Sequence, residues 1–226
     1  MASVAGDAAQ QTDQSQRAWW LRAVLVLEAP RPVFAALRDD SAEASDARQE
    51  PVTALVILAG IAGVLAAPTT GELLDDAEMD IVLLLVTVFL AGALYGLVSY
   101  WLGGGALQLA LERFGSRGGY RRSRHLLAFA SAPLVLSLFV VWPVRLAVHG
   151  GDTFRTGGRD AGTAGTVFLG VELVFVAWAL VLLVIGVRAV HGWSWYRALA
   201  ASAVAVALAG VVLGAFAALF TAASPY

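Results

Sequence analysis

The chain has 226 residues with a formal net charge of −2 at pH 7, and 59% of its residues are hydrophobic while only 14% are charged. Soluble domains contain about 45–50% apolar and about 25% charged residues, so this composition excludes an ordinary soluble domain and indicates a membrane protein. The near-zero net charge gives no support for nucleic-acid binding. The absence of cysteine excludes disulfides, thiolate metal sites and cysteine nucleophiles.

The N-terminal region is polar or only weakly apolar. Residues 1–16 are small and polar and predict a disordered tail. Residues 17–50 predict a cytoplasmic amphipathic segment followed by a charged linker. Within it, Trp19, Trp20 and Arg22 are typical of an amphipathic helix that lies in the membrane interface with its indoles at headgroup level. The alternative is an ordinary helix packed under the bundle.

Apolar blocks between residues 51 and 223 predict the membrane domain. Pro133 and Pro143 predict a bend in the third block, and the second predicts one long or kinked helix that leaves the membrane near Glu112 and Arg113. The first block has 16 residues, near the lower limit of the roughly 17–25 that span a bilayer. The predicted fold is all-α, a polytopic transmembrane helical bundle of about five spanning helices plus an N-terminal amphipathic interfacial helix. The five approximate spans are residues 52–67, 81–102, 126–148, 167–187 and 198–223.

The arginines are distributed unevenly between the two sides of this topology. Five precede the first block, five lie between the second and third blocks, and two lie between the fourth and fifth. The opposite side has only Arg145, Arg155 and Arg159. Because cytoplasmic loops retain an excess of basic residues, we expect a multi-pass protein of the cell membrane with its N-terminus in the cytoplasm and its C-terminus outside.

Two ionisable residues fall inside the predicted spans. Arg145 lies about one turn from the outer end of the third block, and Glu172 lies about one and a half turns into the fourth. At similar depth they are a candidate intramembrane ion pair, which would offset part of the desolvation cost of each charge. The favoured interpretation is a structural pair, or Arg145 extending toward the headgroups. The alternative is a proton or ion relay.

The densest basic cluster is FGSRGGYRRSRH, between the second and third blocks. Together with the N-terminal tryptophans it predicts a surface for anionic lipid or a protein partner, since each basic residue near an anionic membrane contributes about 1 kcal/mol. The alternative is that these arginines only set the topology. The candidate residues of this surface are Trp19, Trp20, Arg22, Arg117, Arg121, Arg122 and Arg124.

Glycines supply candidate helix-packing positions. Gly92 and Gly96 in the second block, and Gly210 and Gly214 in the fifth, are pairs that allow close approach of helix backbones. They predict packing within one bundle, or a homo-oligomer face. The glycine run 103–105 lacks the Lys and Ser or Thr of a phosphate-binding loop and predicts a bend or a close approach. The three histidines fall on both sides of the predicted membrane, so no metal or other cofactor is expected.

Three stretches carry a likeness to a known family. The first is WWLRAVLVLEAPRPVFAALRD, where an apolar run, a proline and Val-Phe precede a charged linker. The second is the glycine-containing end of the second block leading to ERFG. The third is GGYRRSRHLLAFASAPLVL, a basic stretch that enters the third block through small residues. Over residues 19–222 the chain resembles the Yip1 family of five-helix membrane proteins, and most closely its prokaryotic members.

The resemblance implies a cytoplasmic N-terminus and five spanning helices. Eukaryotic relatives are linked with vesicle trafficking and membrane organisation. Their DLYGP-type motif is absent here, so an association with Rab-type GTPases is not carried over. The leading hypothesis is a non-enzymatic membrane-organising or scaffold protein that contacts membrane lipids and a membrane or cytoplasmic protein. The alternative is a small transporter or channel that uses Arg145 and Glu172.

Overall fold

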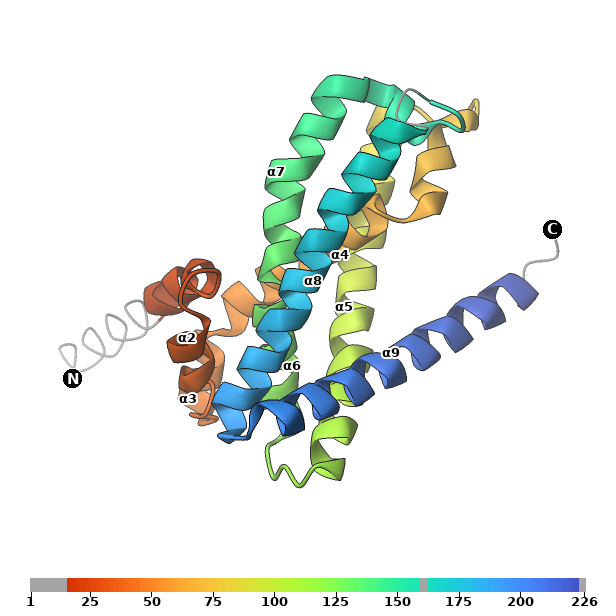
Figure 1. Ribbon diagram of the computed structural model, residues 1–226. Coiled ribbons are helices and arrows are strands. Elements are labelled where there is room, and N and C mark those ends of the chain that lie inside the picture. The colour runs from red at the N-terminus through yellow and green to blue at the C-terminus, as the bar shows by residue number, and fades with distance from the viewer. Residues whose placement is uncertain (1–15, 159–161, 224–226) are drawn as a thin grey trace, which may run out of the picture.

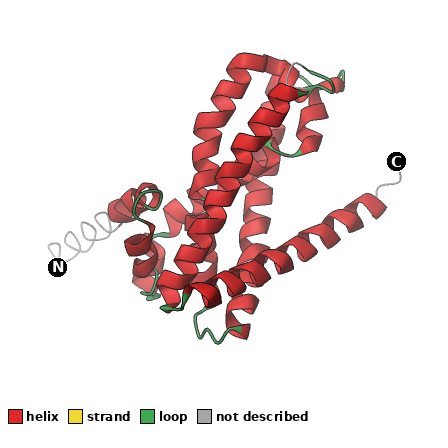
Figure 2. Cartoon of the chain, in the orientation of Figure 1, coloured by secondary structure: helices red, strands yellow, loops and turns green. Residues whose placement is uncertain are grey.

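The computed structural model describes residues 16–158 and 162–223, with only the backbone described at 213 and 216–223. All regular structure in these ranges is helical, as the sequence predicts (Figure 2). The predicted disordered tail lies outside the described residues except for Gln16, which is helical.

Three short helices precede the membrane domain and fold against one end of it (Figure 1). The first covers residues 16–25. The second is α2 (Pro30–Ala36), whose prolines lie in its first turn, where no intrahelical N–H bond is lost. The third is α3 (Ala42–Ala47), which is capped by the Ser41 hydroxyl accepting the Ala44 N–H at 3.2 Å. The predicted amphipathic segment is thus helical, and its apolar residues form two separate short helices, residues 16–25 and α2.

The first predicted span is the weakest membrane element in the structure as well as in the sequence. Residues 52–65 of it lie in α4 (Gln49–Leu65), which has 17 residues. The short 3₁₀ helix η1 (Pro68–Asp75) follows after a bend of 65°. Among the described residues four helices are long and apolar enough to cross a membrane, and five if α4 and η1 together make one span.

The second and third spans continue beyond their apolar blocks. α5 (Ile81–Arg113) is one helix of 33 residues that ends where the sequence predicts. α6 (Tyr120–Ala130) and α7 (Ala132–His149) meet at Ser131. Pro133 lies in the first turn of α7, and Pro143 lies inside that helix. The basic residues after Tyr120 are therefore helical.

The last two helices are also longer than predicted. η2 (Gly150–Phe154) leads toward α8 (Thr163–His191), which ends at Gly192 with a φ of +69°. This left-handed conformation favours glycine and turns the chain into α9 (Trp195–Ala223). α9 packs on α5 near its start and then extends away from the other helices (Figure 1).

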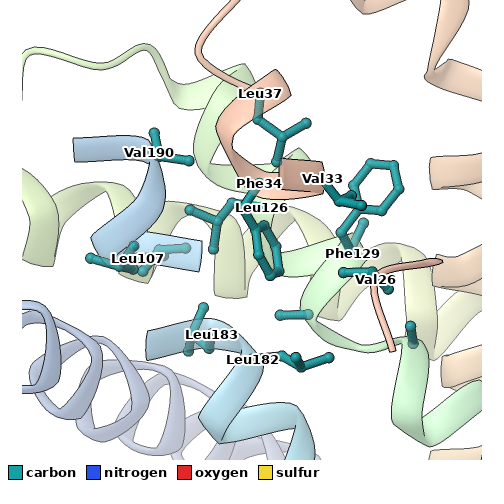
Figure 3. Close-up of a cluster of buried hydrophobic side chains, with 14 of the residues drawn as sticks. Val26, Val33, Phe34, Leu37, Leu107, Leu126, Phe129, Leu182, Leu183 and Val190 are labelled. Atoms are coloured by element: carbon teal, nitrogen blue, oxygen red, sulfur yellow. The ribbon is translucent and has the colours of Figure 1, made fainter. Parts of the chain in front are cut away.

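The largest buried cluster lies where the N-terminal helices meet α5, α6 and α8 (Figure 3). Phe34 from α2 is fully buried there, and a Cβ at Gly186 of α8 would come within 2.9 Å of its ring. Burying one such side chain contributes about 1.5–3 kcal/mol. Elsewhere the helices expose Leu, Val and Phe along their outer faces, which suits lipid as the solvent.

Candidate functional site

Charge separates the two ends of the bundle in the structure. We define the basic end as residues 16–50, the C-terminal ends of α5 and α8, the N-terminal ends of α6 and α9, and the two turns that join these helices (Figure 1). Twelve of the fifteen arginines belong to these segments. At the opposite end η1 meets η2, and the Asp75 carboxylate accepts the Thr156 N–H at 3.1 Å. The sidedness read from the sequence is therefore a property of the fold.

Asp40 organises three arginines at the basic end. Its carboxylate lies 3.2 Å from Arg48 Nη2, 3.4 Å from Arg121 Nε and 3.7 Å from Arg122 Nη2. Arg121 also donates to the Asp40 carbonyl at 2.7 Å, and Arg122 donates to the Arg38 carbonyl at 3.1 Å. Two arginines of the predicted lipid surface thus hold the N-terminal segment onto α6.

Arg48 is fully buried beneath this cluster. Its Nε donates to His125 Nδ1 at 2.7 Å, and its Nη1 donates to the Asp39 carbonyl at 2.8 Å. Since Nδ1 of His125 accepts this bond, the imidazole is neutral with its proton on Nε2. Burial lowers the pKa of the Arg48 guanidinium, and the nearby Asp40 carboxylate opposes that change. A guanidinium in this setting stays charged and acts as a structural anchor.

The two adjacent tryptophans have different environments. Trp19 is only 4% exposed, its ring lies 5.6 Å from Phe129, and the guanidinium carbons of Arg22 and Arg48 lie 4.5 and 5.5 Å from its centroid. The prediction that Trp19 lines an open surface is wrong, because the short helix packs this side chain into the core. Trp20 is 44% exposed. It belongs to an exposed apolar face of that helix, which consists of Trp20, Leu21, Val24 and Leu25.

Arg124 lies in a cage of aromatic rings. Its guanidinium carbon is 3.7 Å from the Trp101 centroid, 4.8 Å from Tyr120 and 5.1 Å from Tyr100. Its Nε is buried without a hydrogen-bond acceptor among the described residues. A Cβ at Gly104 would collide with Arg124 Cγ, so this glycine allows the close approach that the glycine run predicts.

Aromatic side chains with polar tips gather at the same end. Tryptophan and tyrosine concentrate where a membrane meets water, because one edge of the ring is apolar and the other can hydrogen-bond. Of the remaining surface candidates, Arg117 is exposed in the turn between α5 and α6, and the Arg121 side chain is 42% exposed. The exposed aromatic residues of the basic end are Trp20, Trp101, Tyr120, Trp195 and Tyr196.

Arg145 and Glu172 lie together near the opposite end of the bundle. Arg145 Nη1 is 3.4 Å from Glu172 Oε1, and the two side chains are 17% and 12% exposed. The pair links α7 to α8, and the Arg145 guanidinium also lies 4.8 Å from the Trp142 ring. The structure thus brings the two charges together at a partly buried position.

The glycine pairs differ in what they contact. Gly92 and Gly96 face Gly60 of α4, where an added Cβ on Gly60 would come within 2.6 Å of Gly96 Cα. An added Cβ on Gly210 or Gly214 would meet no described atom within 4 Å. Within one chain the second pair makes no helix contact in the described residues, because α9 has already left the bundle.

Several features of the site carry no clear signal in the sequence. Arg48 and His125 are 77 positions apart, and nothing in the polar linker distinguishes Arg48 from its neighbours. Gly60 lies outside the two GxxxG pairs, yet it is the position at which the backbones of α4 and α5 come closest together. Among the described residues, no three His, Asp or Glu side chains are placed to hold one metal ion.

Comparison with known proteins identifies the family. The sequence matches the Yip1 domain over residues 24–216, which covers most of the chain. No curated protein and no solved structure matches it. The matched range begins in the last turn of the first short helix, contains α2 to α8 in full, ends within α9, and agrees with the all-helical membrane architecture. The chain therefore belongs to the Yip1 family of integral membrane proteins.

Proposed function

We propose that this protein is a non-enzymatic membrane-organising scaffold that acts through lipid and protein contacts at its basic end. The observation that carries the proposal is the coincidence of the arginines and the exposed Trp and Tyr side chains at that end. Anionic headgroups attract such arginines, and the aromatic rings anchor the same surface at headgroup level.

The same charge distribution supports an orientation. If the basic end faces the cytoplasm, the N-terminus is cytoplasmic and, with five spans, the C-terminus is outside. The localisation that goes with this proposal is the cell membrane.

The proposed contact surface consists of those predicted lipid- or partner-contact residues that the fold neither buries nor engages in ion pairs. Arg121 and Arg122 are engaged by Asp40, and Trp19 is buried, so their removal would disturb folding. Arg117 and Arg124 form no ion pair within the described residues. These two arginines and Trp20 are therefore the residues with which to test contact.

Copurification from native membranes tests the proposal. Wild type is expected to recover a stoichiometric protein partner or an enriched anionic lipid, identified by mass spectrometry. The Arg117→Gln, Arg124→Gln variant should lose it, and Arg155→Gln, which removes one arginine at the opposite end, should retain it. Recovery that is equal in all three proteins, or no specific recovery at all, would contradict the scaffold role.

A second candidate function rests on the Arg145 and Glu172 contact. Charged groups inside a membrane are costly and commonly mark ion or proton pathways. The candidate is a small transporter or channel in which this pair binds the solute or relays a proton. Flux of protons or small ions into liposomes, abolished by Glu172→Gln, would support it. If liposomes containing the wild-type protein remain impermeable to protons and small ions, the transporter or channel function is excluded.

Oligomerisation is part of the scaffold proposal. Gly210 and Gly214 lie on a described stretch of α9 that has left the bundle, and both are exposed. Close packing of helix backbones at such a pair would suit a second copy of the chain. Cross-linking in membranes should then detect a homo-oligomer, and Gly210→Leu should reduce it.

A further inference from the structure

A cationic cavity lies between α2 and the C-terminal end of α8. Its volume is about 320 Å³. Three arginines line it, together with Trp193, and no acidic residue does so. Arg31 comes from α2, Arg38 follows α2, and Arg188 belongs to the last turn of α8. None of these three arginines was singled out by a motif in the sequence.

The three guanidinium groups are held in different ways. Arg38 donates from Nε to the Ala189 carbonyl at 3.0 Å, and its Nη2 donates to the same oxygen. Arg188 lies 4.6 Å from the Trp195 centroid, and its Nε is buried without an acceptor among the described residues. Neither Arg31 nor Arg188 forms an ion pair within the described chain. The cluster therefore has no acid to balance its charge among the described residues, and one of its donors, Arg188 Nε, is buried without an acceptor there.

Unused donors next to like charges are unfavourable. A buried donor without an acceptor costs about 1–3 kcal/mol, and like charges around one small cavity repel one another. The carbonyl end of α8 offsets part of this charge through its dipole. That offset is limited, because the Ala189 carbonyl already accepts from Arg38 and the Arg188 carbonyl from the Gly192 N–H. An anion would therefore stabilise the arrangement.

We propose that this cavity binds a phosphate group. A guanidinium offers a planar set of donors that matches two phosphate oxygens. Arg31 and Arg188 can offer this set, whereas Arg38 adds its charge and its Nη1, because its Nε and Nη2 donate to the Ala189 carbonyl. The cavity is roughly ten times the volume of one water, which is about 30 Å³, so it admits a phosphate together with solvent.

Two sources can supply this group. The exposed rings of Trp195 and Tyr196 place the cavity near the expected headgroup level, where the phosphate of an anionic lipid is available. A soluble phosphate could enter from the aqueous side. The site does not depend on the scaffold role, since it rests on a different set of arginines from Arg117 and Arg124.

The test uses the full-length protein in nanodiscs. Native mass spectrometry would count phosphatidic acid molecules retained by wild type, Arg31→Gln, Arg188→Gln and Arg113→Gln. Arg113 is an exposed arginine at the basic end that does not line the cavity, so it controls for loss of charge. Inorganic phosphate, titrated in phosphatidylcholine nanodiscs and followed by ³¹P NMR, forms the second arm.

Each outcome decides the proposal. We expect Arg31→Gln and Arg188→Gln each to weaken binding of the first phosphatidic acid by roughly tenfold, about 1.4 kcal/mol, with no change in Arg113→Gln. Retention of phosphatidic acid with no effect of phosphate identifies a lipid headgroup. Phosphate binding that Arg31→Gln abolishes identifies a soluble ligand. Arg31 is exposed, so its variant should fold normally. Binding that is equal in all variants, or absent in both arms, overturns the proposal.

Discussion

Replacement of Gly60 by alanine tests how the first helix is held. An added Cβ would lie 2.6 Å from both Gly96 Cα and Gly96 N, whereas carbon atoms in contact are about 3.5–4.0 Å apart. The opposing atoms belong to the backbone of α5, so no side chain can move aside. α4 and α5 must separate by about 1 Å, and a gap of that size forfeits about a quarter to a half of the dispersion energy of the contacts.

The expected cost follows from this geometry. Overpacking of this kind costs about 1–3 kcal/mol. Each kcal/mol shifts the melting temperature of a chain of this size by about 2–4 °C, so Tm should fall by about 2–12 °C. This decrease in Tm can be measured by thermal unfolding in detergent micelles, monitored by circular dichroism.

Gly170→Ala is the matched control for this measurement. It places the same methyl group on α8, where no described atom lies within 4 Å of the added carbon. Its Tm should stay the same or rise, because alanine is the better helix former by about 1 kcal/mol. Equal Tm values for the Gly60→Ala and Gly170→Ala proteins would refute the close contact between α4 and α5.

Further predictions concern the basic end. Arg48→Met should lower the free energy of unfolding by about 1–3 kcal/mol in a denaturant titration, because it leaves the buried His125 Nδ1 and the Asp39 carbonyl without their donor; an unchanged midpoint would contradict the network. Asp40→Asn should speed trypsin cleavage at Arg48 by releasing the N-terminal segment, and an unchanged digestion rate would argue against that role. Gly104→Ala should displace Arg124 from the Trp101 ring and change the near-ultraviolet circular dichroism. A spectrum identical to wild type would exclude this contact.

The membrane helices were predictable because lipid imposes a simple requirement. A span needs about 20 apolar residues whose backbone bonds are all internal, and the apolar blocks satisfy it. Their ends were less predictable. α5 continues to Arg113, and α6 begins at Tyr120, since polar residues continue a helix into water as readily as apolar ones continue it in lipid. The helical structure that contains the block 126–148 therefore begins at Tyr120, before the apolar residues start.

The candidate site was predictable only in outline. Counting arginines between the apolar blocks predicted that the charges lie at one end, because the rule that basic residues collect on one side of the membrane depends on sequence order alone. It could not say which arginines are paired, since Asp40 meets Arg121 across 81 positions. The burial of Trp19 next to the exposed Trp20 also depends on how a short helix rotates against the core, which no local pattern specifies.

Two groups of arginines at the basic end differ in whether a carboxylate binds them. Arg48 and Arg121 bind Asp40 and fasten the N-terminal segment. Arg124 and Arg188 lie on aromatic rings, form no ion pair within the described residues, and each has a buried Nε without an acceptor there. Setting the topology requires only that basic residues lie on one side of the membrane, and any exposed arginine would satisfy that rule. It does not require a guanidinium to be placed in a ring cage or beside a cavity. The second group therefore has features that topology alone does not explain, and an anionic ligand would account for them.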